Sequence, residues 1–180
     1  EIVYCSRRAI VNALLRNRHG KEPCHLKEIR SEYEEFCKAN GLDDFSFEGK
    51  VHNAFENFLN RNESRNILES QGKYYRYYDI DSYDIPPLIS QIDFQSYDGC
   101  VIASHRLYED YKELMDTYNI ANGYELHNLL KKHSELVPSN VMFDKMPYIR
   151  IGETDRAAQV KKMYKELAPS SLEEFAEAFY

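Results

Sequence analysis

Side chains that can pair with the edges of nucleobases gather in one short stretch of the chain, residues 50–61. The apolar residues of this stretch recur at helical spacing and define its inner face. The outer face then carries Lys50, His52, Asn53, Asn57, Asn60 and Arg61. An asparagine amide pairs with adenine through two hydrogen bonds, and a lysine ammonium reaches guanine. The stretch therefore has the chemistry of a nucleic-acid contact, and double-stranded DNA is the expected partner.

Three further basic residues follow, and they suit phosphate better than bases. Arg65, Lys73 and Arg76 lie in and beside a predicted hairpin, with Lys73 at the tip, where they would hold the DNA backbone. The acidic residues Glu48, Glu56 and Glu63 lie on or near the same surface and would repel phosphate. The alternative is that the asparagines and lysines only solvate an exposed helix face.

A cluster of tyrosines occupies the second strand of that hairpin, at positions 74, 75, 77 and 78. Exposed tyrosines could stack the bases of a single strand. Successive side chains of a strand point to opposite faces, so Tyr75 and Tyr77 share one face and Tyr74 and Tyr78 share the other. Because a buried aromatic ring removes a large area from water, packing against the helices is the favoured interpretation.

No pattern typical of catalysis or of a cofactor occurs in the sequence. It lacks a phosphate-binding glycine loop, a G-x-S-x-G and an H-E-x-x-H, so we expect neither an enzyme nor a small-molecule cofactor. A zinc site would need Cys24, His25 and Cys37 to meet a fourth ligand such as His52, and no C-x-x-C pair favours this. We therefore expect no metal. The four cysteines lack paired spacing, which favours a reducing intracellular compartment, the cytoplasm or the nucleus.

The charge of the chain is unevenly distributed. The formal net charge of the 180 residues is −7. Residues 1–80 hold 13 basic and 13 acidic residues, whereas residues 81–180 hold 10 and 17. Since an acidic surface repels phosphate, the balance disfavours nucleic acid mainly for the second half.

Three amphipathic helices and a hairpin must position these side chains. Apolar residues recur at helical spacing over 6–19, 26–39 and 46–60; Ser6 is the predicted N-cap of the first stretch, and each stretch ends at or near an asparagine or glycine. The β-prone segments Ile67–Glu69 and Tyr74–Tyr78 then flank a turn that contains Gly72. Helices of this length bury their apolar stripes against one another.

Helix, helix, helix and hairpin is the element order of the winged-helix superfamily, which residues 3–79 resemble. The resemblance is one of pattern and implies a winged helix-turn-helix fold over residues 1–80. Winged helices bind DNA, RNA or protein, so the resemblance implies less about function than about fold. If this unit binds DNA, its third helix would enter the major groove.

The second half repeats part of this pattern. Residues 81–103 contain Pro86-Pro87 and several apolar residues, which predicts a packed linker. Residues 104–152 predict a second helix-turn-helix-like unit with its own hairpin. Its second helix, after Asn122, would present on its outer face Glu125, His127, Asn128, Lys131 and Lys132. Residues 153–180 predict either the start of a third unit or two helices that brace the second.

The expected architecture is therefore mainly α with small β-hairpins, organised as tandem winged-helix or helix-turn-helix units. Both ends of the sequence look cut, so we expect a piece of a larger protein. No apolar run is long enough to cross a membrane. The expected function is duplex DNA binding by helix 46–60 and hairpin 67–78. The alternative is a protein-interaction scaffold of the same fold, bound to other domains of the parent protein or to a protein partner.

Overall fold

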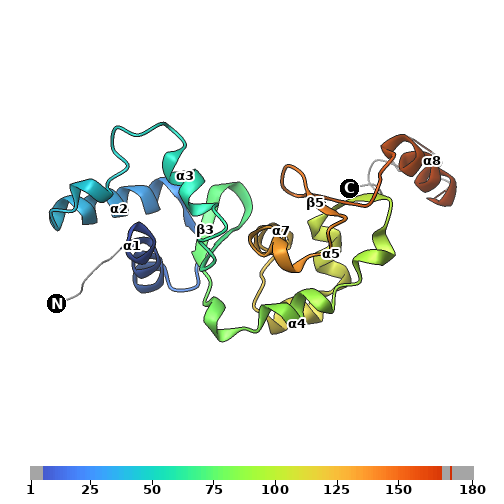
Figure 1. Ribbon diagram of the computed structural model, residues 1–180, viewed down its shortest axis with the longest axis horizontal. Helices are drawn as coiled ribbons and strands as arrows, with labels where there is room; N and C mark the ends of the chain where they lie inside the picture. The colour runs from blue at the N-terminus through green and yellow to red at the C-terminus, as the bar shows by residue number, and fades with distance from the viewer. Residues whose placement is uncertain (1–5, 168–170, 172–180) are drawn as a thin grey trace.

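The computed structural model describes residues 6–167 and residue 171, and it places two units side by side (Figure 1). The first unit comprises α1 (Arg7–Leu14), β1 (Cys24–His25), α2 (Leu26–Ala39), α3 (Ala54–Leu59), β2 (Ile67–Glu69) and β3 (Tyr74–Tyr77). Its three strands form an antiparallel sheet in the order β1-β3-β2.

The second unit has a similar order of elements, with one more helix between its first strand and its hairpin. It comprises α4 (Ile85–Ser90), β4 (Cys100–Ala103), α5 (Ser104–Asp110), α6 (Lys112–Thr117), α7 (Gly123–Lys132), β5 (Val141–Phe143) and β6 (Tyr148–Ile151). Its antiparallel sheet has the order β4-β6-β5, which repeats the order of the first sheet. The expected mainly α architecture with small β-hairpins is confirmed. Among the described residues, no helix is long and apolar enough to span a membrane.

Several helix boundaries follow from the predicted signals. The Ser6 hydroxyl accepts a hydrogen bond from Ala9 N at the start of α1, and Asn122 Oδ1 accepts from the N–H groups of Tyr124 and Glu125 at the start of α7. These side chains satisfy amides that have no partner within the helix. Tyr111 separates α5 from α6, so the helix predicted after residue 104 is interrupted there.

The predicted helix over 46–60 is wrong in its first half, because α3 begins only at Ala54. Residues 46–53 form a loop, and a carboxylate of α2 binds the start of this loop through hydrogen bonds. The Glu34 carboxylate accepts from Ser46 Oγ at 2.5 Å and from Phe47 N at 2.9 Å. Gly49 has a φ of +71°, outside the helical region. The bond to Glu34 gives the Phe47 amide a partner outside a helix. The buried Phe47 ring packs with the rings of Tyr33, Phe55 and Phe58 in the core.

The β2–β3 hairpin is buried on both faces. Its tyrosines pack against the helices of the first unit, as expected, and also against the second unit. Ile67 and Tyr75 belong to the core of the first unit. Leu68 and Tyr78, whose side chains point the other way, are fully buried in the core of the second unit. Only Tyr74 of this strand remains substantially exposed, at 45%. The hairpin therefore joins the two units, and it offers no tyrosine platform for bases.

Residues 81–103 are an integral part of the second unit. They pack, as expected, but they also supply α4 to its core and β4 to its sheet. The sequence predicts a linker because Pro86-Pro87 cannot lie inside a helix, whereas the structure places both prolines in the first turn of the six-residue α4. The second unit therefore begins before residue 104.

The last described helix, α8 (Arg156–Leu167), lies at the far end of the second unit (Figure 1). Its Gln159 side chain accepts a hydrogen bond from Val101 N and donates one to Val101 O. The amide thus pairs with the free edge of β4 as a neighbouring strand would. This contact fits the expectation of bracing helices. The helix predicted from Ser171 to Tyr180 lies outside the described residues, so the third unit remains a prediction.

A buried histidine makes the stability of the second unit depend on pH. His127 lies on α7 with its Nε2 3.3 Å from Tyr148 O and its ring edge-on to Phe143. Burial lowers the pKa of His127 from 6.5 to about 4, and the nearby Lys131 charge acts in the same direction. Between these two pH values the unfolded chain binds the proton and the folded chain does not, so stability falls as pH drops below 6.5.

We expect the His127→Gln variant to lose less stability on acidification than the original chain. The glutamine amide can donate to Tyr148 O and does not titrate. The decrease in unfolding free energy from pH 7 to pH 5, measured with urea, should shrink by about 2 kcal/mol. Burial also lowers the pKa of His133, so the variant should keep part of the pH dependence. An unchanged pH dependence would contradict this assignment.

Candidate nucleic-acid interface

A basic groove lies between the N-terminal end of α1 and α3. It is open, with a volume of about 620 Å³, and no acidic residue is among those that line it. Four of the lining residues are cationic: Arg7, Arg8, Lys50 and Arg61. The exposed amide of Asn57 lies in the same groove. A chain with net charge −7 thus concentrates positive charge on one surface of its first unit.

Arg7 of α1 is held in place by the segment that precedes α3. Arg7 donates from Nε to Phe45 O at 2.7 Å and from Nη2 to Asp44 O at 2.6 Å. Its guanidinium lies over the Phe47 ring, 5.1 Å from the centroid. Arg8 Nε is buried and has no hydrogen-bond partner among the described residues. Arg8 lines the groove with other atoms of its side chain, because this Nε is not accessible to solvent.

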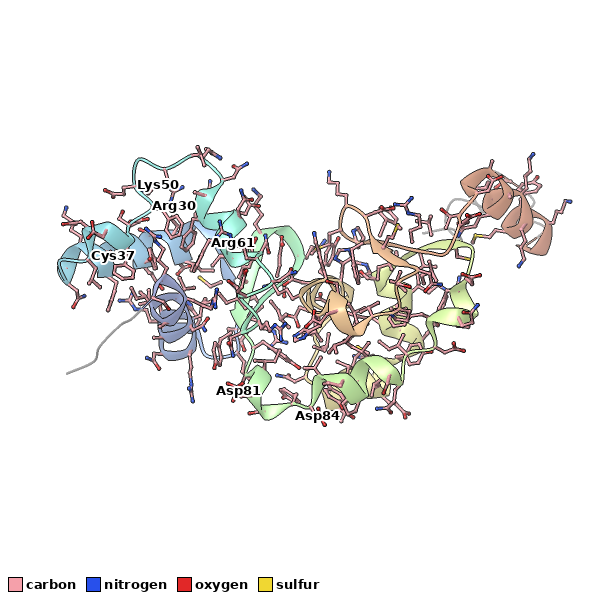
Figure 2. All side chains as sticks on the ribbon, viewed as in Figure 1. Arg30, Cys37, Lys50, Arg61, Asp81 and Asp84 are labelled. Carbon is pink, nitrogen blue, oxygen red and sulfur yellow. The ribbon has the colours of Figure 1, made fainter. Side chains whose placement is uncertain are left out.

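Lys50 and Arg61 carry the exposed charges of the groove. Neither forms an ion pair within the part of the chain that the structure describes. In Figure 2 Lys50 lies on the upper side of the first unit and Arg61 nearer its middle, whereas Asp81 and Asp84 lie on the lower side of the molecule. The acidic residues Asp81 and Asp84 are not among those that line the basic groove.

The structure exposes most of the residues predicted to contact bases. His52, Asn53 and Asn57 are exposed, as are Lys50 and Arg61. Because α3 starts late, Lys50 and His52 lie in the loop before it and Asn53 is its N-cap residue. His52 Nδ1 lies 2.6 Å from Asn53 Oδ1. The loop and the helix together therefore form the candidate surface, in place of one continuous helix.

Asn60 has a structural role that the sequence did not indicate. It is half-buried, and its Nδ2 donates to the hydroxyl of the buried Tyr75 at 3.0 Å. It joins the C-terminal end of α3 to the sheet and is not among the residues that line the groove. Asn60 is therefore not part of the candidate contact surface.

Arg65 and Lys73 are exposed but paired. Arg65 Nη2 lies 2.7 Å from Glu135 Oε1, and Lys73 Nζ lies 3.0 Å from Glu56 Oε2. Exposed pairs of this kind contribute little to stability, so a phosphate could replace either carboxylate at small cost. Lys73 lies at the tip of the hairpin, as predicted. Glu56 is the acidic neighbour that weakens the positive potential there.

The prediction that Arg76 contacts DNA is wrong. Arg76 is only 3% exposed, and its guanidinium donates from Nε and Nη2 to the Glu125 carboxylate at 2.7 and 2.6 Å. Nη2 also donates to Asn119 O. Glu125 is completely buried. Successive residues of a strand alternate between faces, so Arg76 lies on the face of β3 opposite to Tyr75 and points into the second unit.

The polar face of α7 is largely buried, mostly against the first unit and at His127 against Tyr148 and Phe143 of its own unit, which corrects a second expectation. Of the residues predicted on its outer face, only Lys131 is exposed. Asn128 Oδ1 accepts from Glu69 N, and Ser70 Oγ donates to Glu125 Oε1. The first unit therefore covers α7, which corresponds in element order to α3. Among the described elements, only α3 of this pair keeps an exposed polar face.

Lys132 connects α7 to the end of α3. Its Nζ donates to the carbonyl oxygens of Leu59, Ser64 and Ile67 at 3.0, 2.9 and 2.5 Å. Burial lowers the pKa of Lys132 to about 7, and the negative charge of Glu69 opposes that change. Leu59 is the last residue of α3, where helix carbonyls lack partners. The second unit thus fixes the helix that carries the candidate surface.

Arg7 and Arg8 were missed by the sequence reasoning. They are separated from Lys50 by more than 40 residues, and only the packing of α1 against the loop and α3 brings them together. One signal was present in the sequence: two arginines directly follow the N-cap Ser6. A helix N-terminus favours anions, so two cations at this position point to an anion that binds there.

Comparison of the chain with protein-family models, with curated proteins and with solved structures finds no match. Function is therefore inferred from the geometry of the described residues.

Proposed function

We propose that the chain is a pair of winged-helix units and that the first unit binds duplex DNA through the basic groove and α3. Both units place a helix, a strand, further helices and a hairpin in the same order, and both sheets have the same strand order. This arrangement supports the winged-helix assignment. The second unit serves as a rigid support, because its α7 is covered.

The groove of four cations without acidic lining carries this proposal. Phosphate contacts supply most of the affinity for DNA and set the register, whereas base-edge contacts supply specificity. Arg7, Arg8, Lys50 and Arg61 would hold one phosphate backbone. Asn57 and Asn53, exposed at the same surface, would face the base edges. Lys73 would contact a second stretch of backbone after releasing Glu56.

A salt titration tests the proposal. The chain should bind a labelled random-sequence duplex at low ionic strength, measured by fluorescence anisotropy. If four cations neutralise phosphates, the logarithm of the association constant should fall against the logarithm of salt concentration with a slope of about −3.6. Absence of binding even at low ionic strength would reject DNA binding by the chain.

Protein interaction is the second candidate function. Met142 and Tyr148, in the hairpin of the second unit, are 52% and 40% exposed. Exposed methionine and tyrosine are typical of the centres of protein interfaces. In this case the chain would be a scaffold, and the same titration would show no binding to duplex.

A further inference from the structure

A second group of potential ligands lies at the other end of α1, away from the basic groove. After α1 the chain continues as a π-helical turn, Leu15–His19, which ends at Gly20. β1 and the first two turns of α2 follow. One ring nitrogen of His19, the Sγ of Cys24 and a carboxylate oxygen of Glu28 all lie within 4.8 Å of one another. Three separate elements thus bring three different metal-ligand types to one point.

A fourth candidate ligand belongs to the same cluster. Glu32 lies one helical turn after Glu28, so both carboxylates lie on one face of α2. Glu32 Oε2 is 3.0 Å from His19 Nε2, and its Oε1 is 3.4 Å from Arg18 Nη1. A carboxylate bonded to one nitrogen of a ligating imidazole is the usual arrangement around protein-bound zinc, where it orients the ring.

The cluster places a buried thiol beside carboxylate oxygens. Cys24 is only 3% exposed, and its Sγ lies within 4.8 Å of a Glu28 carboxylate oxygen. A divalent ion would compensate the charges of the thiolate and the carboxylate. On binding, the Sγ–H proton would be released to solvent as the sulfur–metal bond forms.

We propose that His19, Cys24 and Glu28 bind a Zn²⁺ ion, with Glu32 orienting His19 or completing the four ligands. Sulfur and imidazole ligands favour zinc over magnesium and calcium, which prefer oxygen alone. Ligand atoms of one zinc ion lie roughly 3.3–3.8 Å apart. Rotation of the exposed Glu28 side chain can close the remaining distance. The ion would join the end of α1, β1 and α2, independently of DNA binding.

The zinc set that the sequence suggested, and disfavoured, is not brought together. His25 Nδ1 accepts from Lys27 N as the N-cap of α2, and His52 is bonded to Asn53. Cys37 is buried in the core of the first unit. Among the described residues, the only group of three or more potential ligands is that of His19, Cys24 and Glu28.

Metal titration of the chain, first freed of metals with a chelator, tests the site. We expect one equivalent of Zn²⁺ to bind in competition with a chromogenic chelator and to raise the midpoint of thermal unfolding. Co²⁺ in its place should give a thiolate-to-metal charge-transfer band in the near ultraviolet. Failure of the folded chain to bind one equivalent, or a Co²⁺ complex without that band, would overturn the proposal.

Matched variants locate the ligands. Glu28→Gln should weaken zinc binding at least about tenfold, whereas Glu35→Gln, an exposed change on the same helix, should not. Cys24→Ser should abolish the charge-transfer band, and Cys37→Ser should keep it. The exposed position of Glu28 keeps the test valid if Cys24→Ser fails to fold. Equal affinities of the Glu28→Gln and Glu35→Gln variants would place the ion elsewhere and overturn the assignment.

Discussion

The Arg76→Met variant should lose about 3–5 kcal/mol of unfolding free energy, because it leaves Glu125 charged and buried without its partner. Arg76 and Glu125 are 3% and 0% exposed. Glu125 accepts two hydrogen bonds from Arg76, one from Ser70 Oγ and one from Ala121 N. Urea unfolding at pH 7 measures the loss. A decrease below about 1 kcal/mol would mean that the pair does not hold the units together.

A double-mutant cycle separates the lost partner from the lost packing. Glu125→Gln removes the charge, its one amide oxygen can accept from Ala121 N, and its NH2 group can donate to the Ser70 hydroxyl. In the Arg76→Met/Glu125→Gln chain no uncompensated charge is buried, so this chain should be more stable than Arg76→Met alone. Because the two residues are in direct contact, their effects should not add. Additive effects would contradict a direct coupling of the two side chains.

Reversal of two groove charges should nearly abolish DNA binding. The Lys50→Glu/Arg61→Glu chain loses two exposed cations that form no ion pair with described residues, and it gains two charges that repel phosphate. We expect affinity for random duplex to fall on the order of 100-fold at moderate salt, and the salt slope to shrink by about 2. Fluorescence anisotropy at several salt concentrations measures both quantities.

The matched control carries the same change of net charge on the second unit. Lys131 and Lys145 are exposed and lie outside the groove. Lys131→Glu/Lys145→Glu should therefore reduce affinity much less than the groove variant does. Lys131 is also the one residue of the predicted outer face of α7 that is exposed. Equal losses in the two variants would show that only net charge matters, and that the groove is not the binding site.

The interface between the units explains how a small unit could present a rigid surface. α3 is only six residues long, which is too short to be stable alone. Its aromatic residues pack on α2, and Lys132 of the second unit binds the carbonyl groups at its end. A loss of the interface should therefore also disturb the candidate binding surface. This couples the stability prediction to the binding prediction through one element.

The sequence by itself determined where most helices and strands lie. Apolar residues at helical spacing, the N-caps Ser6 and Asn122 and the turn at Gly72 are local signals, and the structure follows them. Local signals determine local structure because caps and turns satisfy backbone groups within a few residues. The exposure of Asn53 and Asn57 and the pairing of β2 with β3 were also predicted correctly.

Only the tertiary structure decided which polar faces meet solvent. The predicted outer faces of α3 and α7 both carry asparagine, histidine and lysine or lie beside them, yet the first is exposed and the second is largely buried, against β2 and β3 and, at His127, against β6. A polar side chain can be buried at little cost when a partner is present. Those partners come from distant segments: Arg76 for Glu125, and the end of α3 for Lys132.

The same reason explains the groove, the truncated α3 and the proposed zinc ligands. Glu34 on α2 stops the predicted helix by binding the loop at Ser46, and Arg7 meets Lys50 only across the fold. His19 reaches Cys24 because a π-helical turn extends α1. Spacing in a sequence reports the face on which a residue lies, whereas the neighbour that covers this face depends on long-range packing.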